Sequence, residues 1–309
     1  MGRFGIQPAA GSPREVVDGI LVVNKPPGMT SRAVVDRVAA MMPGTKVGHA
    51  GTLDPLASGV LVVCAGPSTR LVEVVQQLPK SYRTGIRLGA RSDTLDAEGR
   101  IEPEANPPVP SRGAVDQAVG LLVGEVVQVP PAYSAVKVQG RRAYDLARAG
   151  RTVELTGRRV RIDRIAVLRY NWPHLELEID CGSGTYIRSI ARDLGEALGC
   201  GGLVETLTRS RIGPFTIDQA VDLVELSTES LPRSLRSPLD ALADWPRLAL
   251  DPGQVAAITA GQRLGSGAFG PAGIPQGWVA LLGPDGRLVA LAESNPSQGW
   301  IQPRKVFGG

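Results

Sequence analysis

An uninterrupted apolar run, Val60-Leu61-Val62-Val63-Cys64, follows directly on a loop bounded by glycines. Such a run is typical of a strand that is buried on both faces, because a surface strand would alternate apolar and polar residues. The loop carries Asp54-Pro55, and Pro55 disfavours the helical region for Asp54. The pattern predicts a carboxylate held on a constrained loop beside a rigid strand. Taken alone, the Asp-Pro pair could equally mark a simple turn.

The rest of the chain shows strand-like and helix-like segments that interleave without a regular βαβ period. We therefore expect an α+β fold, with a mixed or antiparallel sheet and flanking helices. A linker is expected near residues 238–252, followed by a short helix and a hairpin around Gly283-Pro284-Asp285-Gly286, which together indicate a small β domain. The expected strands are 19–26, 60–64, 81–88 and 175–179, the expected helices are 31–42, 69–78, 111–122 and 185–198, and 93–110 is expected to be loop.

Composition excludes several classes of protein. No apolar run approaches the roughly 18 residues of a membrane span, and the Gly-, Pro- and Ala-rich residues 1–14 lack the apolar core of a signal peptide. The three cysteines lie far apart and the two histidines fall in unrelated contexts, so neither a disulfide framework nor a metal site is expected. We expect a cytoplasmic protein with a mobile tail over residues 1–15.

Basic residues gather in one part of the chain, although the formal net charge is only +4. Between residues 137 and 164 there are nine lysines and arginines against three acids. Such a run could be a solvated helix face laced with ion pairs, or it could bind a polyanion.

The loop 48–59 resembles the motif that carries the catalytic aspartate in the TruB family of tRNA pseudouridine synthases. The family pattern, GH-x-G-x-LDP-x-A-x-G, is matched at every fixed position. Three further segments, 24–31, 80–89 and 184–189, resemble other motifs of this family in the same order, so that the resemblance covers most of residues 19–215. It implies the pseudouridine synthase fold.

The resemblance implies that the chain isomerises the T-loop uridine of tRNA, position 55, to the Ψ of the TΨC arm. The reaction detaches uracil from the ribose C1′ and rejoins it through C5, so no cofactor is needed. By resemblance Asp54 is the catalytic carboxylate, Arg188 pairs with it and lowers its pKa, and Tyr82 stacks on the flipped base. Whether Asp54 adds to the sugar, adds to the base or assists a glycal route stays open. On an alternating strand, Tyr82 could also be a core aromatic.

Further residues are assigned to substrate binding by the same resemblance. His49 would hold the rearranged RNA loop, although it could also be a satisfied loop histidine, and Lys25 would support the base pocket or meet phosphate. Tyr186 and Leu207 would form walls of that pocket. The basic stretch from Pro130 matches a family insertion that clasps the T-loop, and its expected RNA contacts are Lys137, Arg141 and Arg142.

The expected organisation is a tail over 1–15, a catalytic domain over 16–245 with an RNA-binding insertion at about 130–160, and a PUA-like RNA-binding domain over 246–309. The expected partner is the T-arm stem-loop of tRNA, bound by a monomer without a guide RNA, a membrane or a metal. Two alternatives share these motifs: a guide-RNA-dependent relative, and an RNA-binding protein or tRNA-folding chaperone without catalysis. Asp54 and Arg188 are both present, which favours an enzyme.

Overall fold

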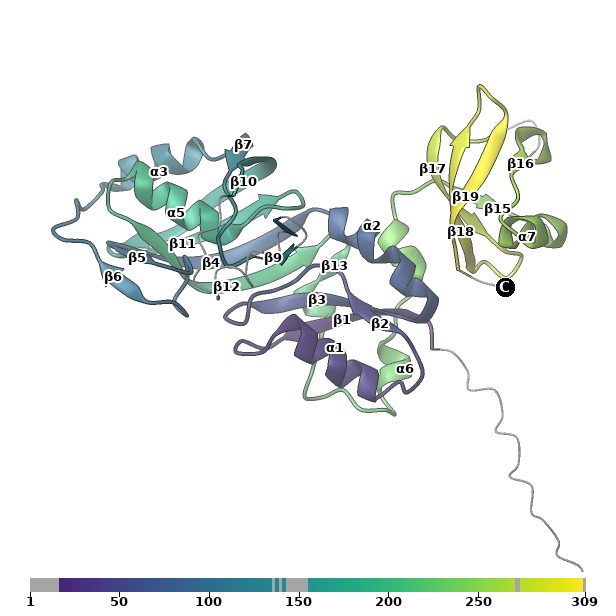
Figure 1. The fold of residues 1–309 in the computed structure, drawn as a ribbon, viewed down its shortest axis with the longest axis horizontal. Coiled ribbons are helices and arrows are strands. Elements are labelled where there is room, and N and C mark those ends of the chain that lie inside the picture. Colours follow the sequence, from purple (N-terminus) through teal and green to yellow (C-terminus); the bar gives the residue numbers. More distant parts are fainter. Residues whose placement is uncertain (1–16, 135–136, 139–140, 143–154, 270–272, 308–309) are drawn as a thin grey trace, which may run out of the picture.

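A computed structural model describes residues 17–134, 137–138, 141–142, 155–269 and 273–307. A ten-stranded sheet forms the larger part of the molecule, and a five-stranded sheet near the C-terminus forms a smaller part (Figure 1). No helix in the described residues is long and apolar enough to cross a membrane.

The large sheet is mixed, as the sequence predicts. Its main path runs β14-β1-β3-β12-β4-β11-β10-β7, with β13 paired to β12 and β2 paired to β3. The β1/β14 and β3/β12 pairs are parallel, and the other pairs are antiparallel. Its strands are β1 (Gly19–Lys25), β2 (Val47–His49), β3 (Ser58–Ala65), β4 (Lys80–Leu88), β7 (Gly124–Gln128), β10 (Arg158–Asn171), β11 (His174–Cys181), β12 (Gly202–Ile212), β13 (Phe215–Thr216) and β14 (Val221–Asp222).

Strand β3 is buried on both faces, which confirms the interpretation of its apolar run. Val60 and Val62 point into one core cluster, with residues of η1 (Gly66–Leu71) and α2 (Val72–Gln77). Leu61 and Val63 point into another cluster on the opposite face, against α1 (Ser31–Ala40). The strand on which the Asp54 loop ends is therefore fixed from both sides.

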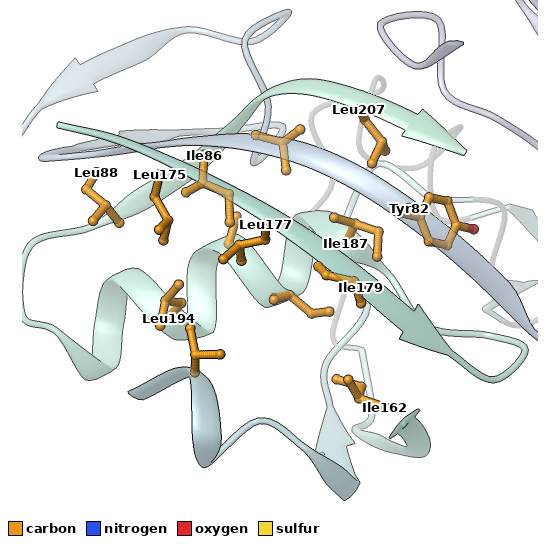
Figure 2. Packing of buried hydrophobic residues seen from close by; sticks show 14 of the residues in the cluster. Tyr82, Ile86, Leu88, Ile162, Leu175, Leu177, Ile179, Ile187, Leu194 and Leu207 are labelled. Carbon is orange, nitrogen blue, oxygen red and sulfur yellow. The ribbon is translucent and has the colours of Figure 1, made fainter. Parts of the chain in front are cut away.

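Helices α3 (Arg112–Gly120) and α5 (Ile187–Ala197) cover one face of the β4, β11 and β10 half of the sheet (Figure 1). Figure 2 shows the resulting core, in which Ile86, Leu177 and Leu194 pack together. The side chains of Thr30 and Ser111 accept backbone N–H groups at the starts of α1 and α3 and cap these helices. The remaining helical segments are α6 (Leu231–Ser234), α7 (Pro252–Thr259), η2 (Ile217–Gln219), η3 (Pro238–Leu242) and η4 (Ser266–Phe269).

The five-stranded sheet has the order β15-β17-β18-β19-β16 and contains the expected hairpin. One face packs on α7, while residues of the other face, including Leu291, join a core cluster of the large sheet. That it is a PUA-like RNA-binding domain stays a prediction. Its strands are β15 (Arg247–Ala249), β16 (Leu264–Gly265), β17 (Gly277–Leu282), β18 (Leu288–Asn295) and β19 (Trp300–Val306).

Local patterning was wrong in three places, and in a fourth the structure excludes a helix that was one of two alternatives. The expected linker contains β15, because residues 247–249 pair with β17. The expected loop 93–110 contains β6 (Ile101–Pro103), which pairs with β5 (Ala90–Ser92). The expected helix 69–78 is split into η1 and α2. The basic residues 158–164 lie on strand β10 and not on a helix, since they pair with β7 and β11. In each case except the split helix 69–78, the secondary structure is determined by pairing with another strand of the chain.

Candidate active site

The Asp54 loop joins β2 to β3 and is held by two buried side chains from other elements. The Ser31 hydroxyl accepts the backbone N–H of Leu53 at 2.8 Å and donates to the Leu53 carbonyl at 3.0 Å. The Arg209 guanidinium, on β12, donates to the carbonyls of Gly51 at 2.9 Å and Val60 at 2.8 Å. These bonds tie both arms of the loop to the sheet, so the direction of Asp54 is set by the core.

Glycine is required where the loop enters β3. Gly59 has a φ of +98°, and a Cβ there would lie 2.3 Å from the backbone oxygen of Arg209. Both the conformation and the close approach of β12 exclude any other residue without movement of the backbone.

Arg188, in the first turn of α5, pairs with Asp54 as the sequence predicts. Its Nη2 donates to Asp54 Oδ1 at 3.0 Å, and its Nε lies 3.0 Å from Oδ2 without the alignment of a hydrogen bond. The Arg188 side chain is 6% exposed, whereas that of Asp54 is 34% exposed. The guanidinium is therefore a buried support, and the carboxylate is the member of the pair that solvent or a ligand can reach.

A second acid, Asp96, shares the same guanidinium. Its Oδ2 lies 3.3 Å from Arg188 Nη1, and its side chain is 4% exposed. Arg188 also donates to the carbonyls of Thr94 and Tyr133, each at 2.9 Å. Asp96 was not predicted as a site residue, because it lies in a polar stretch that was expected to be loop. The roles of Arg209 and Ser31 in holding the loop were missed because their contacts join residues far apart in the chain.

Burial raises the pKa of the Asp54 carboxyl above its usual value, while the Arg188 guanidinium opposes the rise and Asp96 adds to it. Arg188 lowers the pKa of Asp54 as expected, but desolvation, which was not considered, is the larger effect and the net shift is upward. The physical consequence is that Asp54 depends on Arg188 to remain ionised.

A cavity of about 390 Å³ opens beside this pair. Asp54, Arg188, Tyr186 and Leu207 all line it, so four of the expected site residues are brought together. Its volume falls within the range of sites for small ligands. Two larger hollows lie elsewhere, one on the face of β4, β11 and β12 and one between the two sheets, and neither contains Asp54 or Arg188. The hollow beside Asp54 and Arg188 is the candidate site, because the chemical groups that line a hollow, and not its size, define a site.

Tyr82 lies in the core. It is at one end of a row of β4 side chains that also contains Ile86 and Leu88 (Figure 2). It is 8% exposed, and burial raises the pKa of its hydroxyl. It is a core aromatic in this structure, and Leu207, which packs in the same cluster, also lines the cavity. Stacking of the Tyr82 ring on a base stays a prediction.

Lys25 and His49 flank the Asp54 loop. Lys25 is fully buried, and its ammonium donates to the carbonyls of Pro26, Met29 and Pro55. Of its two expected roles, the structure therefore favours support of the loop over contact with phosphate. In the described part of the chain, Nδ1 of His49 is buried without a hydrogen-bond partner, and burial lowers its pKa. A backbone hydrogen bond with Gly51 opposes this lowering, so both alternatives, a loop histidine and a residue that holds the RNA, stay open.

The expected RNA contacts Lys137, Arg141 and Arg142 have side chains that lie outside the described residues. Their backbone forms two short paired strands, β8 (Lys137–Val138) and β9 (Arg141–Arg142). Farther along the basic stretch, exposed arginines of β10 pair with acids: Arg161 with Asp163, and Arg164 with Glu178. That part of the stretch is thus a solvated, ion-paired strand face.

Two family models match adjacent parts of this chain. Residues 39–187 match the N-terminal domain of the TruB family of pseudouridylate synthases, and residues 188–242 match the C-terminal domain of tRNA pseudouridylate synthase B. The chain is 44% identical over 289 residues to tRNA pseudouridine synthase B of Mycobacterium sp. (strain KMS), with 91% of this chain and 93% of the relative covered. It is 42% identical to that of Thermobifida fusca (strain YX) over 303 residues, covering 95% and 100%.

Among solved structures, a Cbf5-Nop10-Gar1 complex contains a chain of similar fold. Its TM-score is 0.72 at 27% identity, and the match covers 94% of this chain and 85% of that one. An H/ACA RNP bound to a substrate RNA containing 2′-deoxyuridine gives a TM-score of 0.71 at 25% identity, with the same coverage.

Proposed function

The chain belongs to the TruB family of pseudouridylate synthases, which makes it a tRNA pseudouridine synthase, and we propose that it acts on the T-loop uridine with Asp54 as the catalytic carboxylate. The observation that carries the assignment of Asp54 is its pairing with the buried Arg188 at the wall of an open cavity. A reactive acid needs this combination of access, orientation and a fixed counter-charge.

The reaction breaks the bond between N1 and C1′ and forms a bond between C5 and C1′. The proton on C5 leaves, and N1 gains a proton, so atoms balance without a cofactor. Asp54 serves as nucleophile or base during the transfer. Arg188 holds both carboxylate oxygens in place and favours the ionised form, which burial alone would disfavour.

The uracil must leave the RNA stack to reach this cavity, at a cost of a few kcal/mol. Leu207 and Tyr186 supply apolar and aromatic walls on which an everted base packs. Tyr82 contributes its hydroxyl or its ring face once the bound nucleotide displaces neighbouring side chains, because it is almost fully buried beforehand.

We further propose that the enzyme acts without a guide RNA and as a monomer. Relatives named tRNA pseudouridine synthase B, 42–44% identical over nearly their whole length, support action without a guide RNA more strongly than the 25–27% identity to chains of H/ACA complexes opposes it. Turnover of naked tRNA by the purified chain is the expected result.

Release of tritium from tRNA labelled at uracil C5 tests both the residue and the position. Wild type should release tritium from a tRNA transcript, and a transcript with cytidine at the T-loop position should release none. Asp54→Asn should bind the tRNA but release nothing. The matched control is Asp36→Asn, which alters an exposed acid of α1 and should leave turnover intact. Tritium release by Asp54→Asn would overturn the catalytic assignment, and release from the cytidine transcript would overturn the position.

A further inference from the structure

Lys80 is a buried ammonium that lacks a counter-charge. It is 6% exposed, and no carboxylate forms a salt bridge with it among the residues that the structure describes. Buried lysines are rare unless they are paired, because desolvation of the charge is costly. Burial lowers the pKa of Lys80 to about 8, with the Arg209 guanidinium adding to the effect. The side chain therefore stays mostly charged at neutral pH.

The contrast with Lys25 shows what is missing. An ammonium has three N–H donors, and Lys25 uses all three on backbone carbonyls. Lys80 uses two, on the carbonyls of Gln76 and Leu78. Within the described ranges its third donor has no protein acceptor. All three N–H donors of Lys25 are thus used to hold backbone carbonyls, whereas one N–H donor of Lys80 remains available for a ligand.

Lys80 lines the same cavity as Asp54. It lies two residues before Tyr82 on β4, so both side chains leave the strand on one face. Near Lys80 the cavity wall is built from Gln76 and Gln77, both exposed, and from the exposed Gly184 of the turn before α5. We call this end, which is lined by exposed residues, the mouth of the cavity, and the end beside Asp54 and the buried Arg188 the Asp54 end.

The charges of the wall favour an anion at the mouth. The lining contains three cations, Lys80, Arg188 and Arg209, against one acid, Asp54. Arg188 is committed to Asp54, and Arg209 to the carbonyls of the loop. The first turn of α5 adds the positive end of a helix dipole without an acid or a side-chain cap of its own. Lys80 differs from both arginines, because among the described residues it has neither a carboxylate partner nor an acceptor for its third N–H.

We propose that Lys80 binds a backbone phosphate that flanks the everted uridine, and so fixes the nucleotide while its base occupies the Asp54 end. This inference rests on the proposed function. A base that enters toward Asp54 leaves its own phosphates at the mouth, where Lys80 lies. A phosphate also supplies the counter-charge that the buried ammonium lacks, which a neutral uracil carbonyl does not.

The test is equilibrium binding of a T-arm stem-loop RNA by the Asp54→Asn protein, in which turnover cannot interfere, across a series of KCl concentrations. Adding Lys80→Gln should weaken binding roughly ten- to a hundredfold, as for loss of one charged hydrogen bond. It should also make the slope of log K against log salt less negative by about 0.7, the value for one phosphate of a single strand. Lys80→Arg, which retains the charge, is the matched control and should keep the slope.

A second arm changes the RNA, so that its first comparison uses the wild-type Lys80 side chain and does not depend on the folding of a Lys80 variant. A neutral methylphosphonate replaces one phosphate at a time on either side of the target uridine. At the linkage held by Lys80 the affinity should fall and the salt slope should lose about 0.7, and Lys80→Gln should add no further loss there.

An unchanged salt slope in Lys80→Gln, or equal losses for wild-type Lys80 and Lys80→Gln at both methylphosphonate linkages, would overturn the proposal. A kcat loss without any slope change would point to contact with a uracil carbonyl instead. Failure of the proposed function is recognised separately, because the chain with Asp54 intact would then release no tritium from tRNA.

Discussion

Replacing Arg188 by Met removes the cation from between two carboxylates while leaving a side chain of similar length. Asp54 and Asp96 then face one another without compensation, and the carbonyls of Thr94 and Tyr133 lose their donor. Breaking a buried pair costs roughly 3–5 kcal/mol of unfolding free energy. We expect the lower end, about 3 kcal/mol, because the Asp54 side chain is 34% exposed and water replaces part of the lost interaction.

The same change should shift the pH dependence of turnover. Loss of an adjacent opposite charge raises a carboxyl pKa by about 1–3 units. Since the reaction needs ionised Asp54, the acidic limb of the kcat/KM profile should move to higher pH by that amount. Wild-type Asp54 already has a raised pKa from burial, so the variant should be nearly inactive at weakly acidic pH and recover partly in alkali.

The raised pKa of Asp54 in Arg188→Met should also change how the unfolding free energy depends on pH. In Arg188→Met the folded pKa of Asp54 lies well above its unfolded value, so the native state binds more protons than the unfolded state. Unfolding free energy then falls as pH rises from the ordinary carboxyl pKa of about 4 to the raised folded pKa. Urea unfolding at pH 5 and pH 8 should therefore show a larger deficit, relative to wild type, at pH 8.

Arg188→Lys is the matched control, since it keeps the charge and loses the planar fork. It should lower kcat while the acidic limb moves less than in Arg188→Met. An Arg188→Met profile with its acidic limb in the wild-type position, or an equal stability deficit at both pH values, would refute the reasoning that the guanidinium keeps Asp54 ionised.

Three further substitutions test how the site is built. Gly59→Ala should cost more than about 1 kcal/mol by urea unfolding and lower kcat, because its Cβ meets the backbone of Arg209; a neutral effect would contradict the close approach. Ser31→Ala should cost about 1–3 kcal/mol, since both polar groups of Leu53 lose a buried partner, and wild-type stability would show that the hydroxyl does not anchor the loop. Tyr82→Phe should change stability by less than about 1.5 kcal/mol but reduce single-turnover pseudouridine formation, and full activity would exclude a role for the hydroxyl.

Much of the fold could be predicted because it depends on local chemistry. The caps at Thr30 and Ser111 satisfy N–H groups three residues away, and the alternation of β4 puts Tyr82 and Ile86 on one face whatever lies opposite. The pairing of Asp54 with Arg188 was also expected, through resemblance to a family. These conclusions concern residues within a few positions of one another, or a motif long enough to identify a relative.

Burial and long-range partners were decided only by the tertiary structure. Asp96 lies 92 positions from Arg188, and no spacing rule relates them. The net rise in the pKa of Asp54 follows from how deeply the loop is packed, which outweighs the charge that the sequence could name. Lys25 and Lys80 are both buried lysines, yet one has three carbonyl acceptors and the other two. The chain thus encodes which chemical groups it carries, whereas desolvation and the choice of partner arise only where distant segments meet.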